Sequence, residues 1–276
     1  MRAILVGAGG MGQAWARNLK DHDVTIAAWV DLRPEAVREA AEKHEVTPDY
    51  VGSDLREAIQ KANADFVVDV TIPEAHCEVT VTALGEGLPV IGEKPMASSM
   101  AEARRMIEAS ERAGKLYMVS QSRRYDQGLR GFKKLIQEQL GGLGILNADF
   151  YIGAHFGGFR DEMPSPLVLD MAIHTFDEAR YLSDADPLYV YAEEFNPGWS
   201  WYKGDACASA IFEMSNGLRF TYRGSWCAEG LHTSWDGDWR AVGPNGSAIW
   251  EKNGKPYASI VSDRGGFHST MRHVEG

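Results

Sequence analysis

The first 120 residues alternate between two patterns of hydrophobic and polar positions. Short, almost continuously apolar runs, which are typical of buried parallel strands, are separated by longer segments with helical spacing. In residues 100–113, Ala103, Met106 and Ile107 recur three or four positions apart, and Gly114 is placed to end the helix. This alternation predicts an α/β fold with a parallel sheet covered by helices on both faces. The predicted strands are residues 3–6, 25–30, 66–72, 89–91 and 116–119.

The pattern changes after about residue 124. Helices are predicted at about 128–139 and at 167–182, and a glycine-rich loop at 155–160 lies between them. Most of the remaining segments have the pattern of strands, and Asn216-Gly217 is a hairpin turn signal between two of them. We therefore expect a second, α+β domain with a large mixed or antiparallel sheet. Its predicted strands are residues 145–152, 189–194, 206–214, 218–228, 239–242 and 247–250.

Composition and charge narrow the class of protein. The chain has 276 residues, enough for two domains that need no disulfide or metal to fold. It carries 28 Lys and Arg against 39 Asp and Glu, and the formal net charge of −11 disfavours nucleic acid as a partner. Its three cysteines are too scattered for a disulfide framework or a zinc site. Because no segment resembles a signal peptide or a membrane span, we expect a cytoplasmic protein that does not bind membranes.

A glycine motif follows the first predicted strand. Residues 7–12 read Gly-Ala-Gly-Gly-Met-Gly, which fits Gly-x-Gly-x-x-Gly, and a helical stretch begins directly after it. In this motif Gly7 permits a tight turn, Gly9 lets the backbone approach a pyrophosphate, and Gly12 lets the helix pack closely on the strand. Gly10 and Met11 complete the turn at the helix N-terminus, which faces the phosphates. The motif predicts a dinucleotide-binding Rossmann domain over residues 1–122, followed by the α+β domain over residues 123–276.

The residue after the second predicted strand bears on the choice of dinucleotide. Asp31 comes 19 residues after Gly12. An acid at this distance binds the ribose hydroxyls of NAD and repels the 2′-phosphate of NADP. Arg33, two residues later, can partly offset that repulsion. We predict NAD as the cofactor, with NADP as the alternative, and no metal ion.

Two further groups of residues indicate acid–base chemistry. Lys94 stands in a Glu-Lys-Pro triplet after a predicted strand, where open α/β sheets bind their ligands. Asp170, His174 and Asp177 are four and three residues apart in a predicted helix, so we expect them on one face. A carboxylate beside an imidazole supports general acid–base catalysis near neutral pH.

These motifs, in this order, resemble the Gfo/Idh/MocA family of nicotinamide-dependent oxidoreductases, which includes glucose–fructose oxidoreductase and inositol dehydrogenase. The resemblance spans about residues 1–250, and its most specific feature is the Glu-Lys-Pro triplet about 80 residues after the glycine motif. The chain departs from the family in residues 164–172, which lack the usual glycines, and in a shorter C-terminal part. The motifs that carry the resemblance are residues 7–12, 71–76, 93–95 and 123–125 and the pair Asp170 and His174.

The resemblance implies hydride transfer between the nicotinamide and a secondary alcohol or ketone of a sugar, polyol or cyclitol. It implies His174 as the base, Lys94 as the cation that polarises the reacting oxygen, and Asp170 as an orienting carboxylate. The expected substrate contacts are Lys94, Arg124, Tyr125, His155, Asp170 and His174.

Cofactor contacts are expected along the ends of several predicted strands. The segment 71–76 lies where its backbone would line the phosphate and ribose of the cofactor, and two further strand ends would face the nicotinamide. The expected contacts beyond residues 7–12, Asp31 and Arg33 are Thr71, Ile72, Pro73, His76, Glu93, Lys94 and Gln121.

Two other functions fit parts of the pattern. A non-catalytic dinucleotide-binding sensor or assembly protein fits the short C-terminal part and the altered segment before Asp170. A metal-dependent lyase or isomerase fits His155, Asp170 and His174 as ligands, but it leaves the glycine motif and Lys94 unexplained. The dehydrogenase is therefore the leading hypothesis. Because the open sheet of this family often packs in an oligomer interface, we also expect a homodimer or homotetramer.

Overall fold

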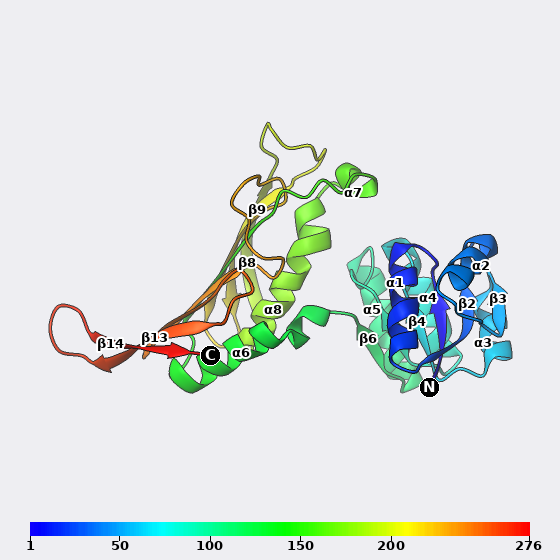
Figure 1. Ribbon diagram of the computed structural model, residues 1–276, viewed down its shortest axis with the longest axis horizontal. Coiled ribbons are helices and arrows are strands. Elements are labelled where there is room, and N and C mark those ends of the chain that lie inside the picture. Colours follow the sequence, from blue (N-terminus) through cyan, green and yellow to red (C-terminus); the bar gives the residue numbers. More distant parts are fainter. The chain divides into compact units, whose positions relative to one another are not determined.

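The computed structural model describes residues 1–276, which divide into two compact units, Met1–Ser120 and Gln121–Gly276 (Figure 1). Each unit contains one β-sheet and its own hydrophobic core. None of the helices is both long and apolar enough to cross a membrane.

Six strands form the sheet of the N-terminal unit: β1 (Arg2–Val6), β2 (Thr25–Val30), β3 (Tyr50–Gly52), β4 (Phe66–Asp69), β5 (Val90–Gly92) and β6 (Tyr117–Val119). Their order is β3-β2-β1-β4-β5-β6, and all neighbours run parallel, which confirms the predicted parallel sheet. The order reverses between β1 and β4, and open α/β sheets bind their ligands beside such a reversal.

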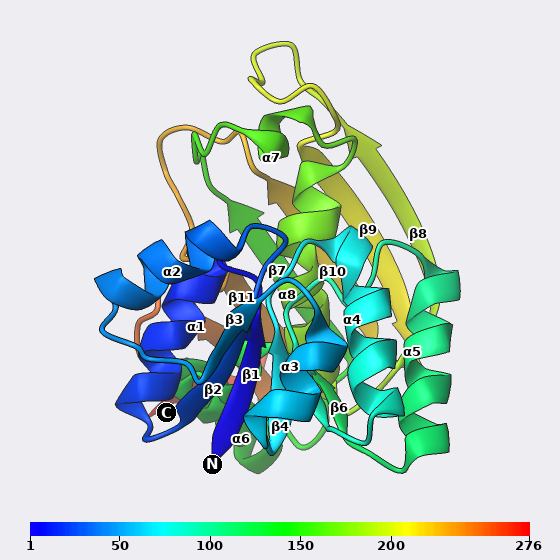
Figure 2. The same ribbon diagram turned by 90° about the vertical axis from the view of Figure 1, so that its right-hand side faces the viewer.

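Five helices cover this sheet: α1 (Gly10–Asp21), α2 (Pro34–Lys43), α3 (Leu55–Ala62), α4 (Pro73–Gly85) and α5 (Met100–Ala113). Alternate residues of β1 point to opposite faces of the sheet. Ala3 and Leu5 belong to the core shared with α1 and α2. Ile4 and Val6 belong to the core shared with α3 and α4. Figure 2 shows α1 and α2 on one side of the strands and α4 and α5 on the other. Burial on both faces explains why these strands are almost continuously apolar.

The strand β4 is shorter than the predicted strand 66–72. Its last residue, Asp69, turns the chain, because the carboxylate accepts hydrogen bonds from the backbone N–H of Thr71 (3.1 Å) and from its hydroxyl (2.6 Å). Ile72 is then the N-cap of α4, and Pro73 is the first residue of that helix, a position that suits proline. The predicted strand is too long because Ile72, although apolar, belongs to the turn and not to the strand.

Eight strands form the sheet of the C-terminal unit: β7 (Ile145–Tyr151), β8 (Pro187–Phe195), β9 (Cys207–Met214), β10 (Arg219–Ser225), β11 (Asp238–Gly243), β12 (Gly246–Trp250), β13 (Tyr257–Asp263) and β14 (Thr270–Glu275). Their order is β14-β13-β12-β11-β7-β10-β9-β8. The pair of β7 and β10 is parallel and the other pairs are antiparallel, so the sheet is mixed, as predicted. Buried Phe220 and Tyr222 alternate with exposed Arg219 and Arg223 along β10, so this strand has one buried face and one polar face.

The helical elements of this unit are η1 (Ser122–Tyr125), α6 (Gln127–Gln139), α7 (Phe159–Glu162), η2 (Leu167–Ala172) and α8 (Ile173–Ser183). Helix α8 packs on the buried face of the sheet, where Phe176 meets Phe212 and Tyr222 edge-on at centroid distances of 5.1 and 5.2 Å. The predicted single α-helix over 167–182 is corrected here, because η2 is a π-helix and α8 begins at Ile173. An apolar period near 3.6 residues cannot reveal one turn that is wider than its neighbours.

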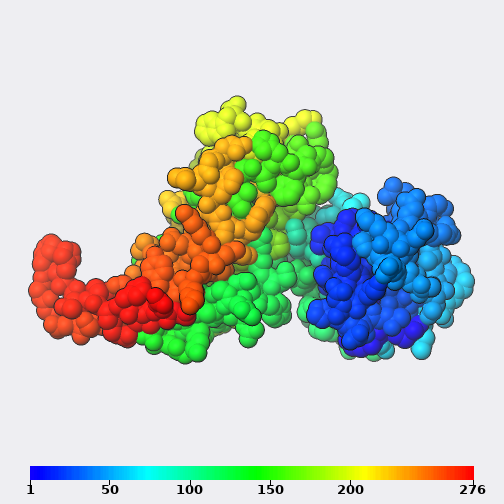
Figure 3. Space-filling view, viewed as in Figure 1, coloured from blue at the N-terminus to red at the C-terminus, as the bar shows by residue number.

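The hairpin of β13 and β14, red in Figures 1 and 3, is not predicted from the sequence. Gly265 and Gly266 break the pattern between the two strands, and almost all of β14 is exposed. Neither strand therefore has the run of buried residues that predicts the other strands of the sheet.

Candidate active site

The loop of residues 7–12 joins β1 to α1 at the C-terminal edge of the parallel sheet. Gly7 has a φ of +110°, and a Cβ there would lie 2.7 Å from the carbonyl oxygen of Val70. A Cβ on Gly12 would lie 2.2 Å from the carbonyl oxygen of Gly7. The protein's own packing therefore requires glycine at both positions. The indole N–H of Trp29 also donates to the carbonyl oxygen of Gly7 (2.9 Å) and fixes the loop.

Gly9 and Gly10 are different, because no protein atom lies within 4 Å of a Cβ built at either position. Gly9 is the N-cap of α1, it provides no side-chain cap, and the first turn of the helix contains no acidic residue. The N–H groups of that turn are therefore available to an anion. Glycine at position 9 is not required by the chain itself, but it is required if a pyrophosphate lies against the backbone. The loop thus fits the phosphates of NAD.

Asp31 follows β2 at the same edge of the sheet. Its Oδ2 accepts a hydrogen bond from the backbone N–H of Ala8 (2.8 Å), and its Oδ1 accepts one from the backbone N–H of Arg33 (2.9 Å). These bonds hold the carboxylate against the glycine loop, where a ribose of NAD would bind. The position of Asp31 therefore fits NAD, and the side chain of Arg33 is exposed.

The turn after β4 is supported from inside the unit. Nε2 of His76, on α4, donates to the carbonyl oxygen of Thr71 (3.1 Å), and Asp69 binds the other side of Thr71. Burial raises the pKa of Asp69, and the neighbouring His76 opposes that shift. His76 is only 1% exposed and supports the turn, and the cofactor contact expected of it stays a prediction. Thr71, Ile72 and Pro73 are not fully buried and remain predicted contacts.

Glu93 and Lys94 follow β5, and the peptide bond between Lys94 and Pro95 is cis. The indole N–H of Trp15 on α1 donates to Oε1 of Glu93 (2.8 Å), and the backbone N–H of Lys94 donates to its Oε2 (3.2 Å). Glu93 thus joins the helix of the glycine loop to the segment that carries Lys94. Trp15 could not be predicted as a site residue, because nothing in its helical spacing indicates a partner 78 residues away.

In the C-terminal unit, Asp170 lies in η2 and is 8% exposed. Nε of Arg160, on α7, donates to Oδ2 of Asp170 (2.7 Å). The guanidinium also lies over the rings of Phe156 and Phe159, at 5.0 and 4.7 Å from their centroids. Arg160 therefore balances a largely buried carboxylate. In the sequence, Arg160 is only the last residue of the predicted glycine-rich loop, and no motif indicates its contact with Asp170.

His174, the second residue of α8, is also 8% exposed. Its Nδ1 lies 2.8 Å from Oε1 of Gln121. Because an amide oxygen only accepts hydrogen bonds, Nδ1 is the donor in this contact. Gln121 is predicted as a cofactor contact, and that contact stays a prediction. The structure gives its side chain a different partner, the candidate base.

Arg124 of η1 binds Asp177 of α8 with two hydrogen bonds, from Nε to Oδ2 (2.9 Å) and from Nη2 to Oδ1. The bond to Asp177 raises the pKa of Arg124. The pair ties η1 to α8, three residues after His174. Tyr125, at the end of η1, is 66% exposed. The substrate contacts predicted for Arg124 and Tyr125 are untested by these bonds and stay predictions.

His155 stacks on Trp201 at a centroid distance of 3.7 Å, and its Nε2 lies 2.8 Å from Oε1 of Glu229. No group of three or more His, Cys, Asp or Glu side chains is arranged to hold a metal ion. The ligand set of the metal-dependent alternative, which needs His155 beside Asp170 and His174, is therefore not formed. A substrate contact by His155 stays a prediction.

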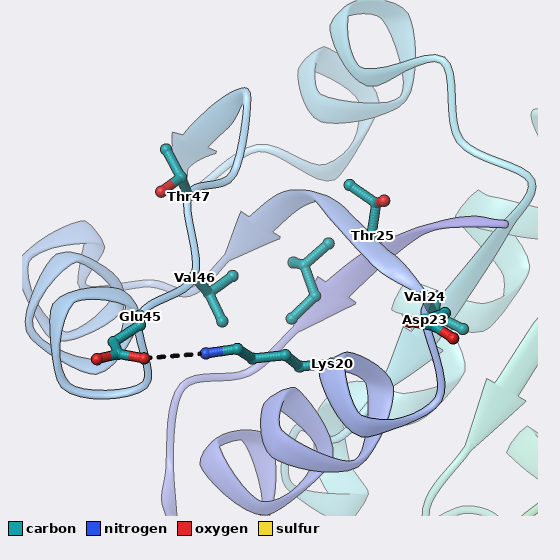
Figure 4. Close-up of a pocket in the computed structure, with 8 residues that line it drawn as sticks. Lys20, Asp23, Val24, Thr25, Glu45, Val46 and Thr47 are labelled. Carbon is teal, nitrogen blue, oxygen red and sulfur yellow. Dashed lines mark hydrogen bonds and ion pairs between the residues drawn. The ribbon is translucent and has the colours of Figure 1, made fainter.

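A surface hollow of about 330 Å³ lies elsewhere in the N-terminal unit (Figure 4). It is bordered by the end of α1, the start of β2 and the segment before β3, and the ion pair of Lys20 with Glu45 (3.2 Å) crosses it. Because it lies at the N-terminal ends of strands, opposite to the edge with the glycine loop, we assign it no part in the site.

Two family models match the chain. Residues 1–121 match the oxidoreductase family with an NAD-binding Rossmann fold, and residues 100–249 match the GFO/IDH/MocA C-terminal domain. The second match alone covers more than half of the chain. The protein belongs to the Gfo/Idh/MocA oxidoreductase family, and its N-terminal unit is the family's NAD-binding domain.

The chain is similar to several members of this family. It is 28% identical over 264 residues to an uncharacterized protein of Sinorhizobium fredii, covering 90% of this chain and 72% of that protein. It is 29% identical over 204 residues to the myo-inositol 2-dehydrogenase of Thermotoga maritima, covering 70% of this chain and 58% of that enzyme. An oxidoreductase from Agrobacterium radiobacter, solved with NAD⁺, L-tartaric acid and magnesium, shares the fold with a TM-score of 0.87 at 20% identity, covering 94% of this chain and 77% of that one.

Proposed function

We propose that this protein is an NAD-dependent oxidoreductase that transfers a hydride between the nicotinamide and a secondary alcohol or ketone of a polyol, cyclitol or sugar. The observation that carries the proposal is the hydrogen bond between Gln121 and Nδ1 of His174, which leaves Nε2 of that imidazole as a base. The same chain has an NAD-binding domain. The similarity to a myo-inositol 2-dehydrogenase supports the substrate class.

The proposed reaction needs a base and a cation at the reacting hydroxyl. The nicotinamide, when bound, supplies the hydride acceptor. Nε2 of His174 accepts the hydroxyl proton, and the ammonium of Lys94 stabilises the oxygen as negative charge develops on it. Asp170, with its charge balanced by Arg160, orients the substrate. The roles of Lys94, Asp170 and His174 are those that the family's motifs imply.

The first test is NAD reduction, followed by nicotinamide absorbance, with a panel of inositols, aldoses and sugar acids. We expect the wild type to turn over at least one of them. Lys94→Met is expected to bind NAD normally and to lower kcat by about 10²-fold or more, because it removes a cation that stabilises the transition state.

The control for that test is Lys134→Met, which removes an exposed lysine of α6 and is expected to leave turnover unchanged. Normal turnover by Lys94→Met would contradict the role of Lys94. NAD binding by the wild type without reduction by any member of the panel would contradict the proposed substrate class.

We also propose that the protein is a homodimer or homotetramer in the cytoplasm. The three cysteines are buried and free, as is usual in a reducing compartment. Large apolar side chains of β8, including Tyr189, Val190 and Tyr191, are more than half exposed and support self-association.

A further inference from the structure

The side chain of Gln121 forms a hydrogen bond with a ring nitrogen of His174. The oxygen of its amide is 2.8 Å from Nδ1, and this oxygen can act only as an acceptor. A neutral imidazole has one protonated nitrogen and one basic nitrogen, and the partner of the first decides which is which. The contact therefore selects between two chemically different forms of His174.

We propose that Gln121 is a positioning residue that holds the proton of His174 on Nδ1 and so presents Nε2 as the base. This inference rests on the proposed function for its catalytic meaning, because Nε2 is the atom that accepts the substrate proton. It assigns to Gln121 a role different from the cofactor contact that its place after β6 predicts.

The residues that follow Gln121 in η1 are bound to the rest of the C-terminal unit. Gln121 is the N-cap of η1, and the two residues after Ser122 are Arg123 and Arg124. Arg123 forms an ion pair with Asp236 (3.6 Å) and lies 3.8 Å from Sδ of Met171, and Arg124 is bound to Asp177 on α8. A preset acceptor costs less side-chain entropy than one that must be ordered for each turnover.

A neutral partner also has a consequence for the charge of His174. An amide orients the ring without adding the negative charge that a carboxylate in the same place would add. Asp170 forms an ion pair with Arg160, and Asp177 forms one with Arg124. Arg123 of η1 lies near Glu178, which is buried on the same helix as His174.

The direct test is the ¹⁵N NMR spectrum of the imidazoles, which reports the tautomer without any turnover. The His174 signals are identified by their loss in His174→Gln. In the wild type we expect the neutral ring to carry its proton on Nδ1. In Gln121→Met, which keeps the length of the side chain but removes the acceptor, we expect the tautomer with the proton on Nε2 to become populated.

Gln121→Glu makes the test specific. A carboxylate accepts the same hydrogen bond, so the Nδ1-protonated tautomer is kept, but its charge raises the pKa of His174. We expect the acidic limb of the pH profile of kcat/KM to move to higher pH by about one unit, with activity recovered above it. Gln121→Met is expected to lose about 10- to 100-fold in kcat at every pH, as when other orienting partners of imidazoles are removed.

The matched controls are Gln139→Met and Gln139→Glu. Gln139 is also partly buried, belongs to the same unit and accepts a hydrogen bond from Arg272 (2.9 Å), far along the sequence from the site. These variants are expected to leave the His174 spectrum and the pH profile unchanged.

The inference is overturned if the neutral His174 of the wild type carries its proton on Nε2, or if Gln121→Met leaves the tautomer unchanged. Failure of the proposed function has a different signature. In that case the NMR spectra behave as expected while the wild type reduces no NAD with any substrate of the panel.

Discussion

At Gly12 the chain leaves no room for a methyl group, because a Cβ would lie 2.2 Å from the carbonyl oxygen of Gly7. At Gly9 nothing in the chain occupies the corresponding space. Two glycines of one motif are therefore required by different partners. Gly12 is needed by the helix that packs on the strand, and we expect that Gly9 is needed by the dinucleotide.

Alanine at these two positions is expected to separate folding from binding. Gly12→Ala should lower the free energy of unfolding by about 1–3 kcal/mol, because backbone must move to admit the methyl group. Gly9→Ala should change it by less than about 1 kcal/mol while raising the Kd for NAD at least tenfold. Urea unfolding and fluorescence titration with NADH measure the two effects. Unchanged affinity in Gly9→Ala would place the pyrophosphate elsewhere.

The glycine motif and Asp31 could be predicted as a candidate site because the expected binding depends on local backbone conformation. A short sequence motif is enough to indicate that conformation. The contacts of Gln121 with His174 and of Trp15 with Glu93 could not. They join residues 53 and 78 positions apart, and no spacing rule connects such pairs before the fold is known. His76 is expected at the cofactor because it follows the fourth predicted strand, whereas its burial depends on the packing of the whole unit.

At the scale of elements, the pair of Arg124 and Asp177 joins η1 to α8 close to the candidate base. The side chains are 33% and 12% exposed, and the arginine binds through two nitrogens. Paired geometry and partial burial distinguish this contact from the exposed ion pairs on the helices of the N-terminal unit.

A double-mutant cycle measures how strongly this pair joins the two elements. With Arg124→Met, Asp177→Asn and the double variant, we expect a coupling energy of about 1–2 kcal/mol in urea unfolding. The exposed pair of Lys134 with Glu138 on α6 is the comparison, and its coupling should be about 0.5 kcal/mol or less. Equal coupling energies for the two pairs would show that the ion pair of Arg124 with Asp177 contributes no more than a surface contact does.

Elements with both faces buried were predictable, since β1, β2 and β4 have continuous apolar runs. The short strand β3 and the exposed strand β14 lack that signal, and both are absent from the predicted strands. These segments are strands because they pair with a neighbouring strand. Their own residues therefore do not indicate a strand until the rest of the sheet is known.

We expect Glu178 to make the free energy of unfolding of the protein depend on pH. This side chain of α8 is fully buried, and neither carboxyl oxygen has a hydrogen-bond partner. Burial raises its pKa well above the usual value, and the nearby Arg123 opposes the shift only partly. The folded protein therefore keeps Glu178 protonated at pH values where the unfolded chain releases the proton.

The sign of the pH dependence follows from this difference. Above about pH 4.5 the unfolded chain binds fewer protons than the folded one, so this group lowers the free energy of unfolding as the pH rises toward the folded pKa. Glu178→Gln removes the effect and should stabilise the protein at pH 7 by about 1.4 kcal/mol for each unit by which the folded pKa, counted only up to pH 7, exceeds the usual value. The gain should vanish near pH 4. Urea unfolding between pH 4 and 8 measures it, and a gain independent of pH would contradict the protonated state.

The assembly can be tested on β8. Light scattering should give two or four times the chain mass of 30.5 kDa. Val190→Asp, which places a charge on the exposed apolar strand, should lower that mass or weaken the assembly. Leu116→Asp, at an exposed position of the N-terminal unit, is the control. A monomeric wild type at micromolar concentration would contradict self-association.

The π-helical turn of η2 determines which genetic changes this part of the chain can accept. A π turn closes its hydrogen bonds over one residue more than an α turn does, so the segment is equivalent to a helix with an inserted residue. Deleting one residue there would let the helix relax to the α form and would rotate Asp170 by about 100° relative to His174. Substitutions between Leu167 and Ala172 should therefore be tolerated far more often than single-residue deletions, and homologues of different length here should differ in the direction of the aspartate.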